Sequence, residues 1–190
     1  MNSDGSEGSL ENYSYGETYG VRHLRSPHKI RKNEMEFKRF DGQKVDLVSY
    51  VSEYCRTHNN IYVMVSTDSQ GRGNKTVFAT VVAMYDEGDG EHGHGAHVIY
   101  RRWNTKRYRK SEIFDRMMAE TTASLDVARF MRDSGIRIGC IDIDINPNEN
   151  TGSNSAFDTA KGWVESEGFE CHWKTLCPMS TTMADEVARK

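Results

Sequence analysis

The sequence contains no long apolar stretch. No apolar run approaches the roughly 18 residues that a membrane-spanning helix requires. Its first residues, Met-Asn-Ser-Asp-Gly-Ser-Glu-Gly, have neither the basic start nor the apolar centre of a signal peptide. We therefore expect no membrane partner and a cytoplasmic location.

Closely spaced cysteines and an excess of positive charge are also missing. Cys55, Cys140, Cys171 and Cys177 form no Cys-x-x-Cys pair and no zinc-like spacing, which favours reduced and mostly buried thiols over disulfides. The formal net charge is −3. Any contact with a polyanion must therefore depend on a local basic patch rather than on the charge of the whole chain.

Two other kinds of site lack support. Ser69 has no Gly-x-Ser-x-Gly elbow around it, which excludes a hydrolase nucleophile of that type. His92, His94 and His97 lie in the segment Glu-His-Gly-His-Gly-Ala-His, with flexible glycines and no cysteine nearby. Since this segment is expected in a hairpin loop, a polar loop is favoured over a zinc site.

Periodic apolar positions are absent from residues 1–34, which are rich in Gly, Ser, Tyr and charged side chains. Such a segment buries too little apolar surface to offset the entropy cost of ordering it, so we expect a disordered tail. Its second half is basic, and contact with phosphates is the alternative there to simple solvation. Residues 35–190 have the length of one domain.

The remaining sequence alternates helix and strand patterns. Helical spacing of apolar residues predicts helices over residues 45–57, 111–133 and 155–167 and from residue 180 onward. In the second helix, Ser111 is the predicted cap and Gly135 the predicted stop. Apolar runs predict strands over residues 61–67, 76–85, 97–103, 136–145 and 169–176, with a polar turn over residues 70–75. The first three strands suggest an antiparallel meander, and the whole order predicts an α/β fold with a mixed sheet.

Acidic side chains stand near the ends of two otherwise apolar strands. Asp68, in the segment Ser-Thr-Asp-Ser-Gln, follows the strand 61–67, and Asp144 lies near the end of the strand 136–145. Such a carboxylate needs hydrogen bonds, a cation or a raised pKa. Either acid alone is more often a strand-end cap. Two acids at corresponding ends favour a shared cation, since open α/β sheets bind ligands there.

The long helix adds a third acid. On a helical wheel, Asp115 and Asp126 fall opposite the apolar face, towards water, whereas Glu120 falls at the border of the buried stripe. From that border Glu120 reaches the edge of the sheet. The alternative is a glutamate that simply marks the solvent border.

The last helix offers Asp185 or Glu186, and the wheel does not choose between them because both lie equally far from its apolar stripe. Thr182-x-x-Asp185 also resembles a capping box, in which Asp185 would close the start of the helix. Both interpretations stay open on the pattern alone.

Five short motifs occur in order between residues 35 and 190. They are Thr67-Asp-Ser-Gln70, Glu120-Thr-Thr-Ala-Ser-Leu125, Ile141-Asp-Ile-Asp-Ile-Asn146, Gly162-Trp-Val-Glu-Ser-Glu-Gly-Phe169 and Ala184-Asp185. This series resembles the YkuK-like family of predicted ribonuclease H-like nucleases. The resemblance implies a ribonuclease H-like mixed sheet, a three-strand antiparallel meander plus two further strands, with helices on both faces.

Matched residue by residue, the acids of that family fall on Asp68, Glu120, Asp144 and Asp185. Asp142 is kept in reserve because it shares a strand face with Asp144. The resemblance implies a metal-dependent nuclease that hydrolyses phosphodiester bonds of RNA, DNA or an RNA/DNA hybrid. Two Mg²⁺ or Mn²⁺ ions held by these carboxylates would be its cofactors, with no small-molecule cofactor.

Polar and basic side chains near these acids are the candidate contacts to nucleic acid. They are Ser69, Gln70, Asn146, Arg107, Arg109 and Lys110. The last three belong to a segment in which basic residues alternate with Trp103 and Tyr108, a composition that suits phosphate contact and base stacking. A solvated strand-to-helix loop is the alternative.

Other functions remain open on the same fold. A proofreading-type 3′-5′ exonuclease would be expected to carry Asp-x-Glu where this sequence has Asp68-Ser-Gln70, and resolvase-like or transposase-like enzymes would differ only in substrate shape. A catalytically inactive nucleic-acid-binding or assembly module is the alternative of a different class, and the four retained acids argue against it. The sequence leaves the oligomeric state open.

Overall fold

The structure is a computed structural model that describes residues 35–88, 95–148, 154–174 and 179–190. The expected tail (residues 1–34), His92, His94 and Cys177 lie outside the described residues. The helices and strands, with η marking short 3-10 helices, are β1 (Glu36–Lys38), β2 (Lys44–Asp46), α1 (Leu47–Thr57), β3 (Ile61–Arg72), β4 (Lys75–Asp86), β5 (Gly95–Lys106), η2 (Lys110–Glu112), α2 (Ile113–Asp133), β6 (Cys140–Ile143), η3 (Asn154–Ala156), α3 (Phe157–Ser166), β7 (Glu170–Trp173) and α4 (Met179–Arg189).

The strands of these described segments form one mixed sheet of seven strands in the order β2-β1-β5-β4-β3-β6-β7. Strands β3, β4 and β5 make the predicted antiparallel meander, and β6 and β7 continue the sheet parallel to β3. The α/β fold class is thereby confirmed. The two extra strands, β1 and β2, form a small antiparallel hairpin that the sequence patterns did not reveal.

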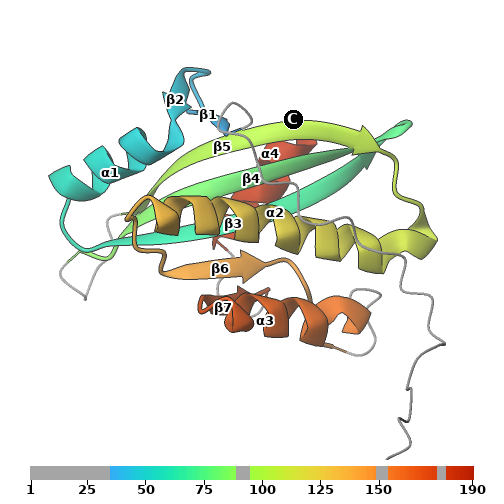
Figure 1. The fold of residues 1–190 in the computed structure, drawn as a ribbon. Coiled ribbons are helices and arrows are strands. Elements are labelled where there is room, and N and C mark those ends of the chain that lie inside the picture. Colours follow the sequence, from blue (N-terminus) through green and yellow to red (C-terminus); the bar gives the residue numbers. More distant parts are fainter. Residues whose placement is uncertain (1–34, 89–94, 149–153, 175–178) are drawn as a thin grey trace, which may run out of the picture.

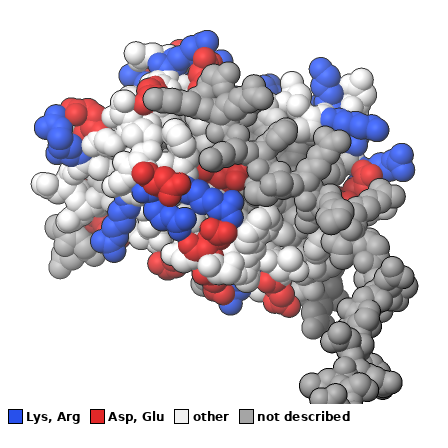
Figure 2. Space-filling view, viewed as in Figure 1, with Lys and Arg blue, Asp and Glu red and all other residues white. Residues whose placement is uncertain are grey.

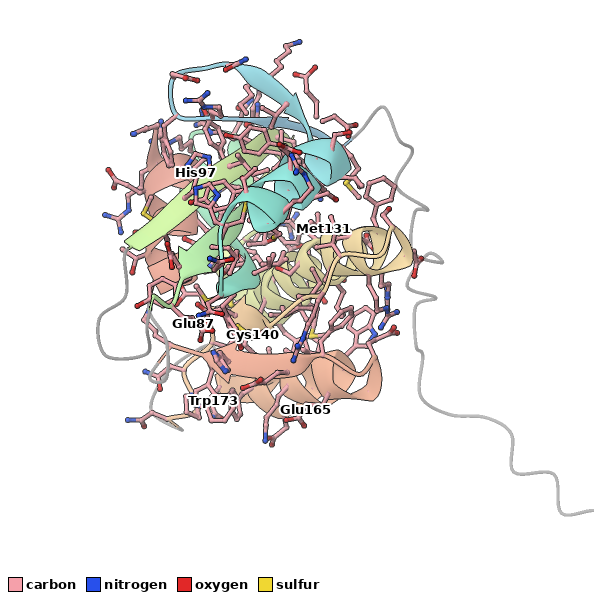
Figure 3. All side chains as sticks on the ribbon, turned by 90° about the vertical axis from the view of Figure 1, so that its left-hand side faces the viewer. Glu87, His97, Met131, Cys140, Glu165 and Trp173 are labelled. Carbon is pink, nitrogen blue, oxygen red and sulfur yellow. The ribbon has the colours of Figure 1, made fainter. Side chains whose placement is uncertain are left out.

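Helices cover both faces of this sheet, as Figure 1 and the end-on view in Figure 3 show. Alternation along β3 explains why: Val63 and Val65 belong to the large core beneath α1, α2 and α3, whereas Met64 belongs to a smaller core beneath α4. Both cores are needed to bury the two faces of the central strands. No helix among the described residues is long and apolar enough to cross a membrane.

Strand β3 is longer than predicted. Its ladder with β4 runs on to the pair Arg72 and Lys75, so that Gly73 and Asn74 alone close the hairpin, with Gly73 at φ +55°. A turn over residues 70–75 was therefore a wrong prediction, because the antiparallel pairing continues through the polar residues. Consequently Asp68 lies inside a strand rather than at its end.

The start of α2 also differs from the prediction. The helix begins after a short 3-10 turn, its cap residue is Glu112, and no side-chain cap bond is present, so Ser111 is not the cap. Instead, the carboxylate of Glu112 accepts a hydrogen bond from the backbone N–H of Arg109 at 2.6 Å. Gly135, at φ +85°, follows the end of the helix as predicted.

One further strand and one further helix are shorter than predicted. The strand expected over residues 136–145 pairs only over Cys140–Ile143, because the residues before it make a single bond to β3, from Gly139 N–H to the carbonyl of Val63. Helix α1 starts at Leu47 rather than residue 45. Residues 44–46 form β2, and Asp46 caps the helix by accepting from the N–H of Ser49 at 2.9 Å.

Candidate active site at the end of the parallel strands

Asp68 and Asp144 lie side by side at one position in the sheet. The parallel ladder between β3 and β6 ends at the pair Thr67 and Ile143, so the two acids are the next residue on each strand. Although Asp68 is not at a strand end, it stands where the parallel pairing stops. The two acids are therefore neighbours, as expected, but Asp68 lies inside a strand rather than at its end.

Glu120 approaches the same place from α2. Only 4% of it is exposed, which excludes the alternative of a glutamate that simply marks the solvent border. Ser69 donates a hydrogen bond to its carboxylate at 2.5 Å, which joins α2 to β3 beside Asp68. Asp126, expected towards water, is also half-buried, in an ion pair with Arg129. Because α2 packs against both the sheet and α3, its buried face is wider than a single stripe.

Asp185 is the acid of α4 that faces the site. It is half-buried and accepts a hydrogen bond from Gln70 Nε2 at 2.8 Å, whereas Glu186 is exposed. Since α4 begins at Met179, Asp185 lies in the second turn of the helix, and the capping-box interpretation was wrong.

Electrostatic coupling links the four acids. Burial, followed by repulsion from Asp144 and a smaller one from Asp185, raises the pKa of Asp68 to about 7. Burial and repulsion from Asp68 raise the pKa of Glu120 well above its usual range, while the bond from Ser69 opposes this increase. Burial and mutual repulsion therefore disfavour the charged forms of these carboxylates.

Within the described residues, three cations contact this acidic cluster, and sequence reasoning found none of them. Arg189 pairs with Asp185 at 2.7 Å, Lys174 pairs with Asp144 at 3.0 Å, and Arg116 lies 4.0 Å from Glu120. The i,i+4 spacing of the two arginines from their acids was a usable signal. Lys174 carried no such local signal, because it follows a different strand.

Asp142, the reserve ligand, lies two residues before Asp144 on β6. It is completely buried, opposite Ser66 in the ladder. Asp144 is half-buried beside Asp68. This placement favours Asp144 over Asp142, and the choice stays a prediction.

The four carboxylates do not form a ready-made metal cage. Among the described residues, no group of three or more His, Cys, Asp or Glu side chains is close enough to hold a metal ion. Each of Glu120, Asp144 and Asp185 is instead held by the partners described above. The chemistry of the donors nevertheless fits Mg²⁺ or Mn²⁺, because all are carboxylate oxygens and the buried Asp68 has no ion pair within the described part of the chain.

The candidate contact residues divide into two groups. Ser69 and Gln70 bind Glu120 and Asp185, so in this structure they orient the acids. The guanidinium of Arg107 packs over Gly71, where an added Cβ would lie 2.5 Å from it. Arg109 and Lys110 are exposed in the turn before α2. The side-chain oxygen of Asn146 accepts a hydrogen bond from the N–H of Asn148 in the segment after β6.

His97, the only member of the proposed histidine group that is described, lies on β5 beside α1, far from Trp173 and the end of β7 (Figure 3). Its Nε2 is 2.8 Å from the hydroxyl of Tyr50, and its ring stacks on Tyr54. Burial lowers its pKa. No disulfide joins Cys55, Cys140 and Cys171, the three cysteines that the structure describes.

Comparison with known protein families gives a match over most of the chain. The family model described as ribonuclease H-like matches residues 46–189, which include β3 to β7 and all four acids. No curated protein and no solved structure matches the chain. The resemblance inferred from the five motifs is confirmed at the level of the family. The chain therefore belongs to the ribonuclease H-like family.

Proposed function

We propose that this protein is a metal-dependent nuclease that hydrolyses phosphodiester bonds of RNA or DNA. One observation carries the proposal: carboxylates from β3, α2, α4 and the residue after β6 influence one another at the point where the parallel pairing ends. Crowding like charges in this way lowers the stability of the fold, and a purely structural role does not require it. Perturbed pKa values of this kind cluster at functional sites.

The residues that would hold the metal are Asp68, Glu120, Asp144 and Asp185. Two divalent ions in such a site supply an activated water and neutralise charge on the leaving oxygen. The protein contributes the alignment of the oxygen donors. Ser69 fixes the carboxylate of Glu120, and Gln70 fixes that of Asp185.

Gln70 also bears on the kind of nuclease. Its amide donates to Asp185 at 2.8 Å, where a glutamate would place a second carboxylate against the first. This contact supports an activity other than that of a proofreading-type exonuclease, which would be expected to have Asp-x-Glu at residues 68–70.

Basic side chains near the site are the proposed contacts for substrate phosphates. Figure 2 shows blue side chains gathered at its right-hand edge, the end of the molecule where Figure 1 places the β3–β4 hairpin and the start of α2. Arg107 is positioned there against Gly71 and donates to the carbonyl of Gly73 at 3.3 Å. Arg109 and Lys110 follow in the exposed turn. Phosphate contacts of this kind position a nucleic acid without selecting its sequence.

The test is a nuclease assay with Mg²⁺ or Mn²⁺ on RNA/DNA hybrid, RNA, duplex DNA, single-stranded DNA and branched DNA. We expect cleavage of at least one substrate by the wild type and a loss of at least about a hundredfold in Asp68→Asn, because the proposed ligand loses its charge. Asp133→Asn, an exposed acid at the far end of α2, is the matched control and should cleave like the wild type.

Cleavage that survives unchanged in Asp68→Asn would overturn the metal mechanism. Binding of these nucleic acids without cleavage of any of them would instead support the inactive binding or assembly module. The two outcomes are distinguished by measuring substrate affinity and cleavage on the same preparations.

A further inference from the structure

Lys174 lies in one row with two of the acids across three parallel strands. The last pairs of the parallel part of the sheet are Thr67 with Ile143 and Ile143 with Trp173. The residue that follows each of these three positions is Asp68, Asp144 and Lys174 in turn. The three side chains therefore belong to the same cross-strand row, just beyond the parallel ladder.

These three side chains also point to the same face. Cys140 packs in the core beneath α4, so Asp144, four residues later, faces α4 as well. On β7, Cys171 belongs to the opposite core, which directs Lys174 towards the α4 face. The fourth acid, Asp185, comes from α4 itself.

The contacts of Lys174 differ from those of the two arginines at the site. Each arginine pairs with an acid four residues away on its own helix, a common arrangement on helix surfaces. Lys174 instead reaches across from the next strand, with its Nζ 3.0 Å from Asp144 Oδ1. Its ammonium therefore neutralises an acid of the row from a different element of the fold, beside Asp68 in the same row.

We propose that Lys174 is the built-in counter-ion of this carboxylate row and competes with a divalent cation for Asp144. The inference rests on the proposed metal site and adds a residue that sets its affinity. An ammonium and a divalent ion on the same carboxylate repel each other, and the ammonium also occupies an oxygen that the ion would use. The side chain of Lys174 is 55% exposed and flexible, so it is able to leave when the ion arrives.

Two consequences follow for metal affinity. Replacing Lys174 with an uncharged residue removes the competitor, so Lys174→Met and Lys174→Gln should bind Mn²⁺ about tenfold more tightly than the wild type. Lys174→Arg keeps the charge and should bind Mn²⁺ with nearly wild-type affinity. A lysine with a purely structural role would give a different result, because its replacement would leave the affinity for Mn²⁺ unchanged.

The experiment is a calorimetric titration of the full chain with Mn²⁺ in the absence of nucleic acid, which measures affinity independently of cleavage. Lys161→Met is the matched control. Lys161 also pairs with a carboxylate, Glu165 at 3.6 Å, and also lies beside the end of β7, over the ring of Trp173, but it belongs to α3 on the other face. Its replacement should leave the affinity for Mn²⁺ unchanged.

The outcomes separate this inference from the proposed function. Tighter Mn²⁺ binding by both Lys174→Met and Lys174→Gln, with Lys174→Arg and Lys161→Met like the wild type, is the expected result. Equal or weaker binding by the two uncharged variants overturns the role of Lys174 and leaves the metal site standing. If neither the wild type nor the uncharged variants bind Mn²⁺ at millimolar concentrations, both the role of Lys174 and the metal site are overturned.

Discussion

Removing the charge of Asp68 should make the metal-free protein more stable, although it removes a proposed ligand. Asp68 is 4% exposed, and its pKa rises from 3.8 to about 7 because of burial and the neighbouring Asp144. Asparagine has nearly the same shape. Its side-chain oxygen retains the bond from the N–H of Ser69, 2.7 Å in the wild type, and its amide finds acceptors among the neighbouring carboxylates.

The expected gain follows from the pKa values. Because the folded chain holds the proton of Asp68 more tightly than the unfolded chain, the stability of the wild type falls as the pH rises from about 4 to about 7, by about 1.4 kcal/mol per pH unit. Above that pH range the loss of stability no longer grows. Its full size is about 4 kcal/mol at pH 8, and about 1.5 kcal/mol has developed by pH 5. We expect Asp68→Asn to recover about 2–4 kcal/mol at pH 8 and much less at pH 5.

Urea denaturation in the presence of EDTA, followed by circular dichroism at both pH values, measures these free energies. Asp133→Asn serves as the control, because Asp133 is exposed outside the acidic cluster, and its free energy of unfolding should change by less than about 0.5 kcal/mol at either pH.

Two results would contradict the electrostatic account of Asp68. One is an Asp68→Asn protein that is no more stable than the wild type at pH 8. The other is an equal gain at pH 5 and pH 8, since a gain that does not depend on pH cannot come from the ionisation of Asp68. Adding Mg²⁺ should narrow the difference at pH 8 by stabilising the wild type alone.

Two smaller perturbations test the side chains that surround the acids. Ser69→Ala removes the donor to the buried Glu120 and should lower the free energy of unfolding by about 1–3 kcal/mol in urea denaturation at pH 8; a loss below about 0.5 kcal/mol would mean that the bond is not stabilising. Gly71→Ala places a Cβ 2.5 Å from the Arg107 guanidinium, which is exposed and able to move, so stability should change by less than about 1 kcal/mol. Affinity for a labelled oligonucleotide, measured by fluorescence anisotropy at low salt, should fall about two- to fivefold, and an unchanged affinity would remove Arg107 from the proposed phosphate contacts.

Local patterns predicted the central elements because these elements are long and periodic. Strands β3, β4 and β5 each exceed the predicted length, yet their apolar cores were visible in the sequence, and so was the long helix α2. The β1–β2 hairpin was missed because each of its strands has three residues, which is too short to show a period. Asp68 and Asp144 stood out in the sequence because charged residues are rare in such apolar segments.

The missed features depend on contacts between distant parts of the chain. The wheel of α2 assumes one buried stripe, so it placed Glu120 only at the border of that stripe and Asp126 towards water, whereas neighbours on two sides bury the helix. Asp185 was inseparable from Glu186 until the start of α4 and its packing were known. Lys174 joins the acids only through the register of three parallel strands, and no local pattern contains that register.

The connection between Gln70 and Asp185 spans 115 positions of the chain, which gives the site an order of assembly. Helix α4 is synthesised after all seven strands, so the sheet is able to form while only three of the four acids face one another. Full repulsion develops only when α4 docks and covers the second core with Ala184, Val187 and Ala188. Apolar burial by that last helix therefore opposes the charge that it brings, and loss of α4 by proteolysis would relieve the repulsion while leaving one face of the sheet open to solvent.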